Sequence, residues 1–539
     1  MYNKLHAYFI KYDCLTWKNS RFKKRDFTTN QLLYLANNIY KNWDEGCDTC
    51  MIYLDQSRAF DRIWHHGLLY KLSTLGIRSN ILSWIKNYLT GRKIRVMIDG
   101  QHSSWQNTSA GVPQGSILRP LFFLAYINDI THGIKCNISL YADDTSLFMP
   151  FNSVNINERF SDLNNDLKSL QSWATRWYMT FNPVKTKYVV FSRRLINAPH
   201  LLLNDSVLER VDKYSHLGVT MSSNMSWNDH INDLLSKTQR KISLMWKLNL
   251  CFPRFVVERI YTMFIRPQVE YGCILYDNCS KYLKSRLDQL QRNAAIACTR
   301  GYINTSSSSL HKELGWEPLQ IRRNYFKLIH MFKIVNNLSP LYLRRLLPVH
   351  NNRRYLLRNQ LDIPIPLCKS ESHKSSFIPS SILLWNGLDP SLRICKSLGS
   401  FKIILKKLLF TNKHNIAFSQ GHGINWIHLS RIRMGMSGLN VHLYNVNIIE
   451  SDVCLACNSE SESALHYFLH CTAYVMHRKQ LLSNLRHLLL INDCILPISD
   501  KNILNLIIYG SSKFPHNLNV SILRLTCSYI SDTKRFIFT

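Results

Sequence analysis

The chain has 539 residues, of which 46% are hydrophobic, which allows several domains with large cores and excludes a disordered protein. Its 67 Lys and Arg residues outnumber its 35 Asp and Glu residues, and the net charge of +32 indicates a polyanionic partner such as nucleic acid. Fifteen scattered cysteines argue against a disulfide framework, and no apolar run reaches the roughly 18 residues of a membrane span.

The first predicted strand ends in a carboxylate. Residues 50–54 are an apolar run that stops at Asp55, so a buried strand would present this acid at its C-terminal end. Residues 57–72 have a helical pattern, which leaves open the alternative that Asp55 is only a helix N-cap. A further helix is predicted at 79–89, and residues 111–116 (GVPQGS) are predicted to form a loop.

Two more apolar runs, 138–141 and 146–149, flank Asp143 and Asp144, which predicts a hairpin with acids at its tip. Such a pair alone is ordinary turn chemistry. Three carboxylates brought together repel one another unless cations neutralise them, and hard oxygen ligands suit Mg²⁺. Two such ions can activate an attacking hydroxyl and stabilise a leaving oxygen in phosphoryl transfer. The order of the three acids therefore predicts a template-directed polymerase.

The remaining segments are predicted to be mainly helical. Apolar residues at helical spacing between Phe160 and Trp177 predict a helix that packs under the sheet, and residues 230–248 predict an amphipathic helix with a basic outer face. Residues 306–309 and 364–381 are predicted to be loops.

A cysteine and histidine motif lies near the C-terminus. Cys454, Cys457, His466 and Cys471 offer three thiolates and an imidazole in a short span, a set that suits tetrahedral structural Zn²⁺. His470 is an alternative to His466. The competing interpretation is a cysteine-bearing helix that follows a CxxC pair by chance.

The chain resembles the reverse transcriptase domain of non-LTR retrotransposons of the jockey and CR1 kind. The similarity runs from about Arg21 to about Gly272 and continues more weakly toward the C-terminus through SFIPSSILLWNGL. The stretches that carry it are LDQSRAFDRIWHHGLLYKL, GVPQGSILRPLFFLAYINDI, YADDTSLF, NPVKTKYVVFS, HLGVTMSSNMSWNDHI and IRPQVEYG.

The resemblance implies roles for the acids and for one aromatic residue. Asp55 and Asp143 would bind two Mg²⁺ ions, with Asp144 as a further ligand or as the acid that orients them. Phe60 matches the steric gate, whose ring would fill the space that a ribonucleotide 2′-hydroxyl needs. An ordinary core aromatic is the alternative for Phe60.

The resemblance also implies contacts with nucleotide and primer. Gln114 and Gly115 lie in the loop that would contact the incoming nucleotide and the template. Lys185 matches the lysine proposed to protonate the leaving pyrophosphate, with Lys187 or a solvated surface charge as alternatives. Residues 216–219 resemble the primer grip, where a glycine would let the backbone approach the primer closely.

Several features depart from the family pattern. Arg119 stands where relatives have Gly, and arginine would strain that backbone if it needs a positive φ. Residues 21–26 replace the family's Gly-Phe-Arg-Lys type of segment. His65 and His66 are expected at exposed helix positions. Relatives carry further finger motifs and an apurinic-type endonuclease domain upstream, so we expect a 5′-truncated copy without the endonuclease.

The expected fold is α+β, a right-hand polymerase fold followed by a mostly helical C-terminal region with a zinc knuckle. The expected domains are a fingers remnant (1–49), the palm (50–196), the primer grip and thumb (197–300), a basic helical connection region (301–440) and the C-terminal region with the CCHC motif (441–539).

The expected function is RNA-directed DNA polymerisation. The partners would be an RNA template, a DNA primer and deoxynucleotides, with no membrane, in a reducing intracellular compartment such as the nucleus or cytoplasm. One alternative is a catalytically inactive relic that binds RNA through its basic surface and zinc knuckle. Another is an RNA-templated RNA polymerase, against which the bulky Phe60 argues.

Overall fold

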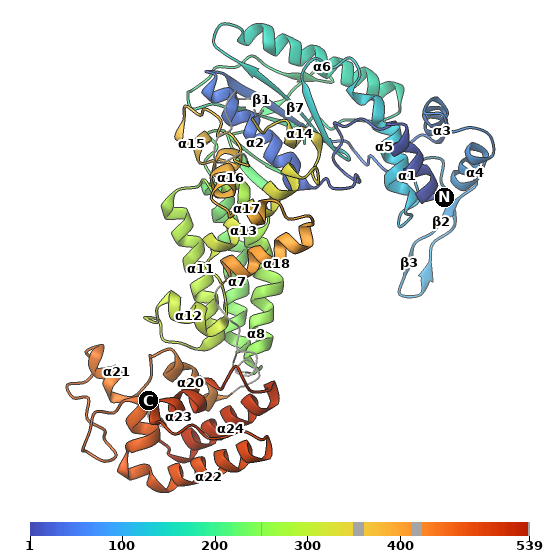
Figure 1. Ribbon diagram of the computed structural model, residues 1–539. Coiled ribbons are helices and arrows are strands. Elements are labelled where there is room, and N and C mark those ends of the chain that lie inside the picture. Colours follow the sequence, from blue (N-terminus) through green and yellow to red (C-terminus); the bar gives the residue numbers. More distant parts are fainter. Residues whose placement is uncertain (250, 349–360, 411–422, 537–539) are drawn as a thin grey trace. The chain divides into compact units, whose positions relative to one another are not determined.

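The computed structural model describes residues 1–249, 251–348, 361–410 and 423–536 (Figure 1). Contacts divide the chain into two units: unit 1 is 1–230, 274–279 and 326–398, and unit 2 is 231–273, 280–325 and 399–539. These units interleave along the chain, whereas the predicted domains are contiguous, and the functional division into five domains stays a prediction.

A five-stranded sheet forms the centre of unit 1. Its order is β11-β8-β1-β7-β6, and β1 pairs antiparallel with both β7 and β8. All seven residues of β1 are buried, which explains why its residues 50–54 are a continuous apolar run rather than an alternating one. The strand bounds are β1 (Asp48–Leu54), β6 (Asn137–Tyr141), β7 (Asp144–Phe151), β8 (Lys187–Phe191) and β11 (Glu209–Arg210).

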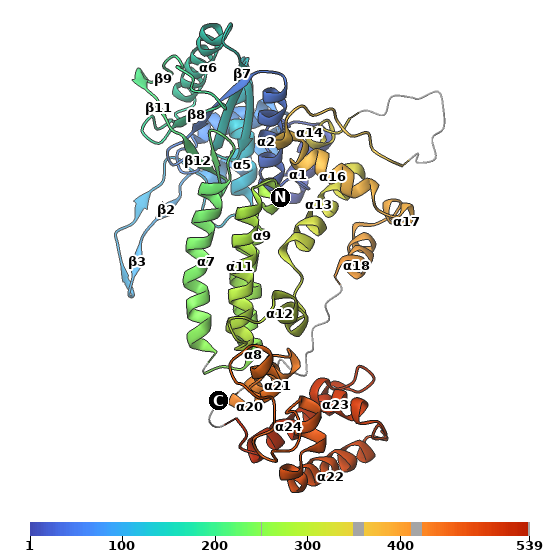
Figure 2. The same cartoon turned by 90° about the vertical axis from the view of Figure 1, so that its left-hand side faces the viewer.

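Helices cover both faces of this sheet (Figures 1 and 2). Alternate residues of β1 face opposite ways, and Cys50, Ile52 and Leu54 join the same core cluster as Leu163 and Leu167 of α6 (Ile156–Arg176). This confirms the predicted helix under the sheet. The other face of β1 packs against α2 (Thr28–Asp44).

Short helices beside the sheet complete this core. The predicted helix at 79–89 is confirmed as α4 (Ser79–Leu89), but the helix predicted at 57–72 begins only at His65, because residues 57–62 form turns. The other helices are α1 (Tyr2–Lys11), α3 (His65–Thr74) and α5 (Leu118–Ile127), followed by the turn η1 (Asn128–Thr131).

Four two-stranded sheets lie outside the main sheet. They pair β2 (Lys93–Ile94) with β5 (Gln106–Asn107), β3 (Met97–Ile98) with β4 (Gln101–His102), β9 (Leu202–Leu203) with β10 (Ser206–Val207), and β12 (Lys213–His216) with β13 (Val219–Ser222). The first two form one long ribbon, residues 92–108, that extends away from the rest of unit 1 (Figure 2).

The predicted loop at 364–381 is partly wrong. It contains α15 (Glu371–Lys374) and the start of α16 (Phe377–Asn386), because Ser370 caps a helix by accepting a hydrogen bond from the His373 N–H. The neighbouring helices are α13 (Leu319–Val335), α14 (Leu341–Arg344), α17 (Pro390–Arg393) and α18 (Leu398–Leu409).

Asp44 at the end of α2 binds the start of α15. Its carboxylate accepts hydrogen bonds from the backbone N–H groups of Lys369 (2.8 Å) and Ser370 (3.0 Å), from the Ser370 hydroxyl (2.6 Å) and from His373 Nδ1 (2.7 Å). Burial acts to raise the pKa of Asp44, but these hydrogen bonds outweigh it and lower the pKa to about 2. One side chain therefore joins segments more than 300 positions apart.

Replacing Asp44 by alanine should lower the free energy of unfolding by about 2 kcal/mol, because four donors, one of them on the buried His373, lose a charged acceptor. The folded-state pKa is depressed, so this contribution is complete above the unfolded pKa of about 4 and is lost as the pH falls toward 2. Thermal denaturation would measure the effect. Glu45→Ala is the matched control, since its pair with Lys41 is exposed and should contribute less than about 0.5 kcal/mol. Equal thermal midpoints for the two variants would contradict the stabilising role of Asp44.

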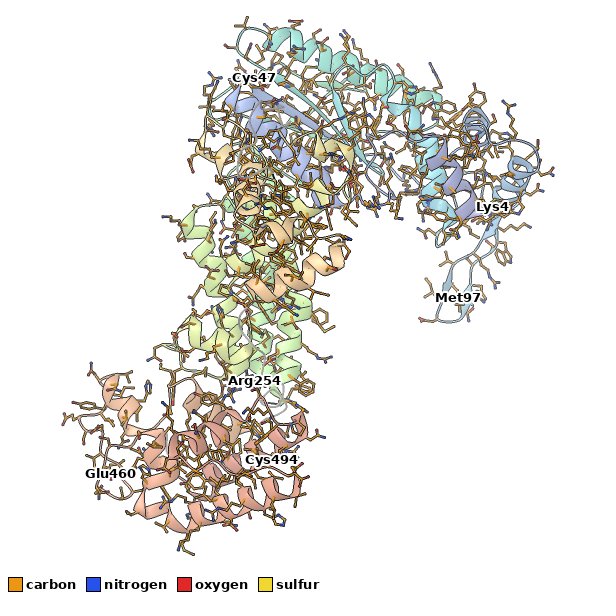
Figure 3. All side chains as sticks on the ribbon, viewed as in Figure 1. Lys4, Cys47, Met97, Arg254, Glu460 and Cys494 are labelled. Carbon is orange, nitrogen blue, oxygen red and sulfur yellow. The ribbon has the colours of Figure 1, made fainter. Side chains whose placement is uncertain are left out.

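Unit 2 is helical throughout its described residues. The predicted helix at 230–248 is confirmed as α7 (Asn228–Leu248), whereas the predicted loop at 306–309 is wrong, because Ser306 caps α12 (Ser307–Leu314). Buried Arg254, labelled in Figure 3, pairs with Glu258 at 2.7 Å and Glu313 at 2.8 Å. The other helices here are α8 (Arg254–Ile260), η2 (Tyr261–Ile265), α9 (Arg266–Glu270) and α11 (Lys281–Thr299), whereas α10 (Cys273–Tyr276) lies in unit 1 except for its first residue.

The C-terminal part of unit 2 has a hydrophobic core of its own, drawn from residues between Leu429 and Phe536. Its elements are α20 (Ile424–Arg433), α21 (Asn440–Asn445), η3 (His466–His470), η4 (Thr472–Tyr474), α22 (Val475–Ile491), α23 (Asp500–Tyr509) and α24 (His516–Asp532). Across the described residues, no helix combines the length and apolar character needed to cross a membrane.

Candidate active site

Strand register places the three predicted acids at one end of the sheet. Leu54 pairs with Thr145, so Asp55 follows β1 at the level where Asp144 begins β7. Tyr141 pairs with Asp144 across a two-residue turn, which contains Asp143. The predicted hairpin with acids at its tip is thus present. Asp55 directly follows strand β1 and is not the N-cap of a helix, since the next helix begins at His65.

The N-terminal segment supports the turn that carries the acids. The Ser20 N–H donates to the Leu140 carbonyl at 2.9 Å, and the Ala142 N–H donates to Asn19 Oδ1 at 3.3 Å. Ala142 has a φ of 58°, a left-handed conformation that costs free energy for a residue with a Cβ. Residues 18–20 therefore help to hold a strained turn in place.

Electrostatic coupling shows that the acids interact. Asp144 has an exposed side chain, yet surrounding protein still desolvates its carboxylate, and this together with the Asp143 and Asp55 charges raises its pKa to about 6. The carboxylate oxygens of the three acids do not all lie within 4.8 Å of one another. A divalent cation would offset this repulsion and draw the oxygens inward.

Arg21 is a charged neighbour of the acids that the sequence did not indicate as functional. Its guanidinium carbon lies 5.1 Å from the centre of the Tyr141 ring, and its charge opposes the rise in the pKa of Asp144. Residues 18–20, which pair with β6, bring it there. The sequence had presented 21–26 only as a departure from the family.

A short loop fixes the position of Asp55. The Asp55 N–H donates to the Thr186 hydroxyl at 3.2 Å, and the Asn182 N–H donates to the Asp55 carbonyl at 2.9 Å. Lys185 lies in this loop and is exposed, whereas Lys187 belongs to β8 and forms an ion pair with Glu209. The choice between Lys185 and Lys187 as the proton donor stays a prediction.

Phe60 lies in a stack with an arginine. Its ring is 4.2 Å from that of Phe123 at an angle of 24°, and the Arg119 guanidinium lies 4.7 Å from the Phe60 ring centre. Arg119 Nη2 also lies 3.3 Å from Asp61 Oδ1. The condition for strain at Arg119 is not met, since Arg119 is the second residue of α5 and its φ is not positive.

The predicted loop at 111–116 contacts the segment after Asp55. A Cβ on Gly111 would lie 2.8 Å from the Asp61 carbonyl oxygen, and Gly111 has a φ of 85°, so only glycine fits there. Contrary to expectation, His65 is buried, and its Nε2 lies 2.7 Å from the Gly111 carbonyl oxygen. Gln114 and Gly115 are exposed, as a nucleotide contact requires.

The predicted primer grip is the hairpin of β12 and β13. Its turn residues, Leu217 and Gly218, both have positive φ. The Tyr214 ring stacks on Tyr53 of β1 with centres 4.2 Å apart. Burial raises the pKa of Tyr214, and the Asp144 and Asp55 charges raise it further, which puts this hairpin close to the acids.

The four predicted zinc ligands converge in the C-terminal part of unit 2. Their ligand atoms all lie within 4.8 Å of one another. Cys454 Sγ is 3.8 Å from Cys471 Sγ, and Cys457 Sγ is 3.3 Å from His466 Nε2. Two thiolates on a tetrahedral zinc ion, with Zn–S bonds of about 2.3 Å, lie about 3.8 Å apart. The donor set and the spacing therefore fit Zn²⁺.

Hydrogen bonds around this cluster favour His466 over His470. The second ring nitrogen of His466 lies 2.9 Å from a carboxylate oxygen of Glu460, which is labelled in Figure 3. A carboxylate that orients the outer nitrogen is usual for a metal-binding histidine. His470 is exposed and interacts with Asp500 at 2.9 Å.

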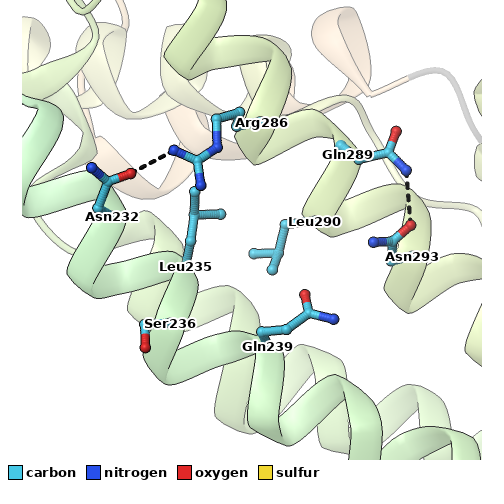
Figure 4. Close-up of a pocket in the computed structure, with 8 residues that line it drawn as sticks. All are labelled: Asn232, Leu235, Ser236, Gln239, Arg286, Gln289, Leu290 and Asn293. Atoms are coloured by element: carbon cyan, nitrogen blue, oxygen red, sulfur yellow. Dashed lines mark hydrogen bonds between the residues drawn. The ribbon is translucent and has the colours of Figure 1, made fainter.

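A separate hollow of about 380 Å³ lies between α7 and α11 (Figure 4). Amide side chains dominate its wall and bond along or across the helices, with Arg286 to Asn232 at 2.5 Å and Gln289 to Asn293 at 2.9 Å. These polar groups already have partners, and none of the predicted site residues lies among those that line it.

The fold and the site together define a class of protein. The mixed sheet carries three acids at one end of its neighbouring strands β1 and β7, and grouped carboxylates of this kind are what two-metal polymerase sites use. Residues 10–221 match the family model described as reverse transcriptase (RNA-dependent DNA polymerase). This part of the chain is a reverse transcriptase domain, related to those of non-LTR retrotransposons.

Known proteins resemble about half of the chain. The RNA-directed DNA polymerase from mobile element jockey of Drosophila melanogaster is 31% identical over 284 residues, which are 50% of this chain and 30% of that protein. The probable RNA-directed DNA polymerase from transposon BS of the same species is 26% identical, covering 62% of this chain and 38% of that protein. Apo telomerase from Candida tropicalis matches 64% of this chain and 54% of its own, with 12% identity and a TM-score of 0.35.

Proposed function

We propose that this chain is an RNA-directed DNA polymerase that extends a DNA primer on an RNA template. The observation that carries the proposal is the register that brings Asp55, Asp143 and Asp144 to one end of β1 and β7 within a reverse transcriptase domain. The chain spans about a third of the relatives' length, so the activity is inferred from this site and not transferred from whole proteins.

The acids would hold two Mg²⁺ ions, which supply activation of the primer 3′-hydroxyl and neutralisation of charge on the phosphates. Asp55 and Asp143 are the proposed ligands, and Asp144 binds or orients beside them. Lys185, exposed in the loop that fixes Asp55, would give a proton to the departing pyrophosphate. Gln114 and Gly115 would contact the nucleotide, and both are exposed, which leaves room for that contact.

Primer extension tests this proposal. The full chain is incubated with a DNA primer annealed to an RNA template, deoxynucleotides and Mg²⁺, and products are resolved by length. We expect stepwise extension that requires the template and all four nucleotides. Template binding without extension would instead support the inactive RNA-binding alternative.

Phe60 gives a prediction about sugar selectivity. Phe60→Val should admit ribonucleotides and lower the preference for deoxynucleotides by at least about tenfold, because the smaller side chain frees the space of the 2′-hydroxyl. Single-nucleotide incorporation with matched deoxy and ribo substrates measures the ratio. Phe123→Leu, on the far side of the stack, is the control for altered packing. An unchanged ratio in Phe60→Val would remove the gate role.

We further propose that Cys454, Cys457, His466 and Cys471 bind one structural Zn²⁺. Their convergence and the Glu460 hydrogen bond to His466 support this. The ion would hold the segment around η3 within the C-terminal core, of which Cys454 and Cys471 are buried members. The basic composition supports a location where RNA is present, in the nucleus or cytoplasm.

A further inference from the structure

Helix α4 and the ribbon 92–108 carry two groups of stacked aromatic and arginine side chains. The Trp84 ring stacks on Tyr88 with centres 5.4 Å apart and planes 10° apart. The Arg92 guanidinium lies 4.5 Å from the centre of the Tyr88 ring. Trp84 and Tyr88 are four positions apart and share one face of α4. Arg92 lies after the end of the helix at Leu89, and its Nε donates a hydrogen bond to the Tyr88 carbonyl at 2.6 Å. We call this set, together with Arg95 and Trp105, the aromatic ladder.

The second group of the ladder is a pair on the ribbon itself. Arg95 lies 4.6 Å from the centre of the Trp105 ring. Strands β2 and β5, which flank these positions, are paired through Lys93 with Asn107 and Ile94 with Gln106, so the pair belongs to an ordered ribbon. Figure 3 shows Met97 at the far end of this ribbon.

The ladder is open to solvent and positively charged. Trp84 is 41% exposed and Trp105 is 57% exposed, large fractions for indole rings. Residues 79–110 contain a single acid, Asp99, and four cations, which are Lys86, Arg92, Lys93 and Arg95. Exposed rings with cations beside them are what a strand of unpaired bases and phosphates recognises.

One hydrogen bond connects the ladder to the nucleotide loop. The Tyr88 hydroxyl donates to the Ser116 hydroxyl at 2.6 Å, and Ser116 directly follows Gln114 and Gly115. At the other end of the ribbon, Ala110 bridges to Trp64, and Gly111 packs on Asp61. Both ends of the ribbon therefore join segments that shape the proposed nucleotide site.

We propose that the aromatic ladder binds single-stranded RNA, whose bases stack on Trp84 and Trp105 while the arginines contact its phosphates. This inference rests on the proposed function in one respect, which is that the bound strand would be the unpaired part of the template. The ribbon also exposes Ile94, Val96, Met97 and Ile98. The cations and stacked rings favour RNA over a protein partner, which these apolar residues alone would suit.

Equilibrium binding tests the ladder without any polymerisation. The probe is a fluorescein-labelled, unstructured 20-nucleotide RNA, and fluorescence anisotropy is measured in Mg²⁺-free buffer at several salt concentrations up to 300 mM. High salt suppresses binding by the rest of this basic chain. We expect the Trp84→Ala/Trp105→Ala double variant to bind at least tenfold more weakly at high salt, since each stacked base contributes strongly. Trp84→Phe/Trp105→Phe should restore most of the affinity.

Two control variants separate stacking from charge and from apolar adhesion. Arg92→Ala/Arg95→Ala should reduce the slope of log affinity against log salt by about 1.4, at about 0.7 for each cation on a single strand. Met97→Ala/Ile98→Ala removes exposed apolar surface from the same ribbon and should bind RNA as the wild type does. A blunt RNA·DNA duplex, whose bases are already stacked, should bind the tryptophan variants and the wild type equally.

Wild-type RNA affinity in the Trp84→Ala/Trp105→Ala variant would overturn the proposal that the aromatic ladder binds RNA, even if the chain extends primers. A loss that appears only in Met97→Ala/Ile98→Ala would also overturn it and indicate an apolar docking surface. A chain that extends no primer but loses RNA affinity in the tryptophan variant would keep the ladder and refute the proposed polymerase activity. The two proposals can therefore fail separately.

Discussion

Asp143→Asn should reduce primer extension by at least about a thousandfold. The substitution keeps the shape of the side chain and removes one charged metal ligand, and the loss of about 4 kcal/mol of transition-state stabilisation corresponds to that factor. Folding should not suffer, because Asp143 helps to raise the pKa of Asp144, and removing its charge relieves this repulsion. The thermal midpoint of Asp143→Asn should therefore equal or exceed that of the wild type.

The matched control is Asp61→Asn. Asp61 is an exposed acid near the site whose carboxylate pairs with Arg119 at 3.3 Å, and it does not follow a strand end. Its variant should retain extension within a few fold, since exposed pairs contribute little. Extension that survives in Asp143→Asn, or that falls equally in both variants, would refute the assignment of the metal ligands.

Cys471→Ser should cost the chain its zinc and much of the stability of its C-terminal part. Structural zinc in small domains contributes on the order of 10 kcal/mol to folding, and here two of the ligands, Cys454 and Cys471, are also buried in the core. Metal analysis should find one zinc ion in the wild-type chain and none in this variant. Hydrogen exchange should show lost protection between residues 429 and 536.

Two other variants make the zinc prediction specific. Cys494→Ser changes a partly buried cysteine of the same region outside the cluster, and it should keep both zinc and protection. His470→Ala should also keep zinc, because His470 interacts with Asp500 and not with the thiols. Zinc that remains bound in Cys471→Ser but is lost in His470→Ala would show that the ligand assignment is wrong.

The parts of the site that the sequence predicted are those that local chemistry determines. A short apolar run that stops at an acid favours a buried strand with the acid at its end. Asp55 and the turn with Asp143 were therefore placed correctly. The convergence of Cys454, Cys457, His466 and Cys471 was predicted for the same reason, because these residues lie within eighteen consecutive positions. Spacing along the chain sufficed in both cases.

The parts that sequence reasoning missed depend on contacts between distant segments or on an ambiguous local signal. Arg21 reaches the acids only because residues 18–20 pair beside β6, and His65 is buried only because Gly111 packs over its segment. Serine-rich stretches were interpreted as loops, yet Ser306 and Ser370 are N-caps that start helices. The same residue types favour caps and turns, so composition alone cannot separate them.

Arg119 has a consequence for how such a chain changes over generations. A single base change converts many glycine codons into arginine codons, and this position tolerates the product: its φ is ordinary, its charge meets Asp61, and its guanidinium covers the Phe60 ring. A substitution that the surrounding structure accommodates in this way does not lower the stability of the fold, so selection does not remove it for that reason. Arg119 is therefore accommodated by the fold, and its presence is no structural argument against an active site.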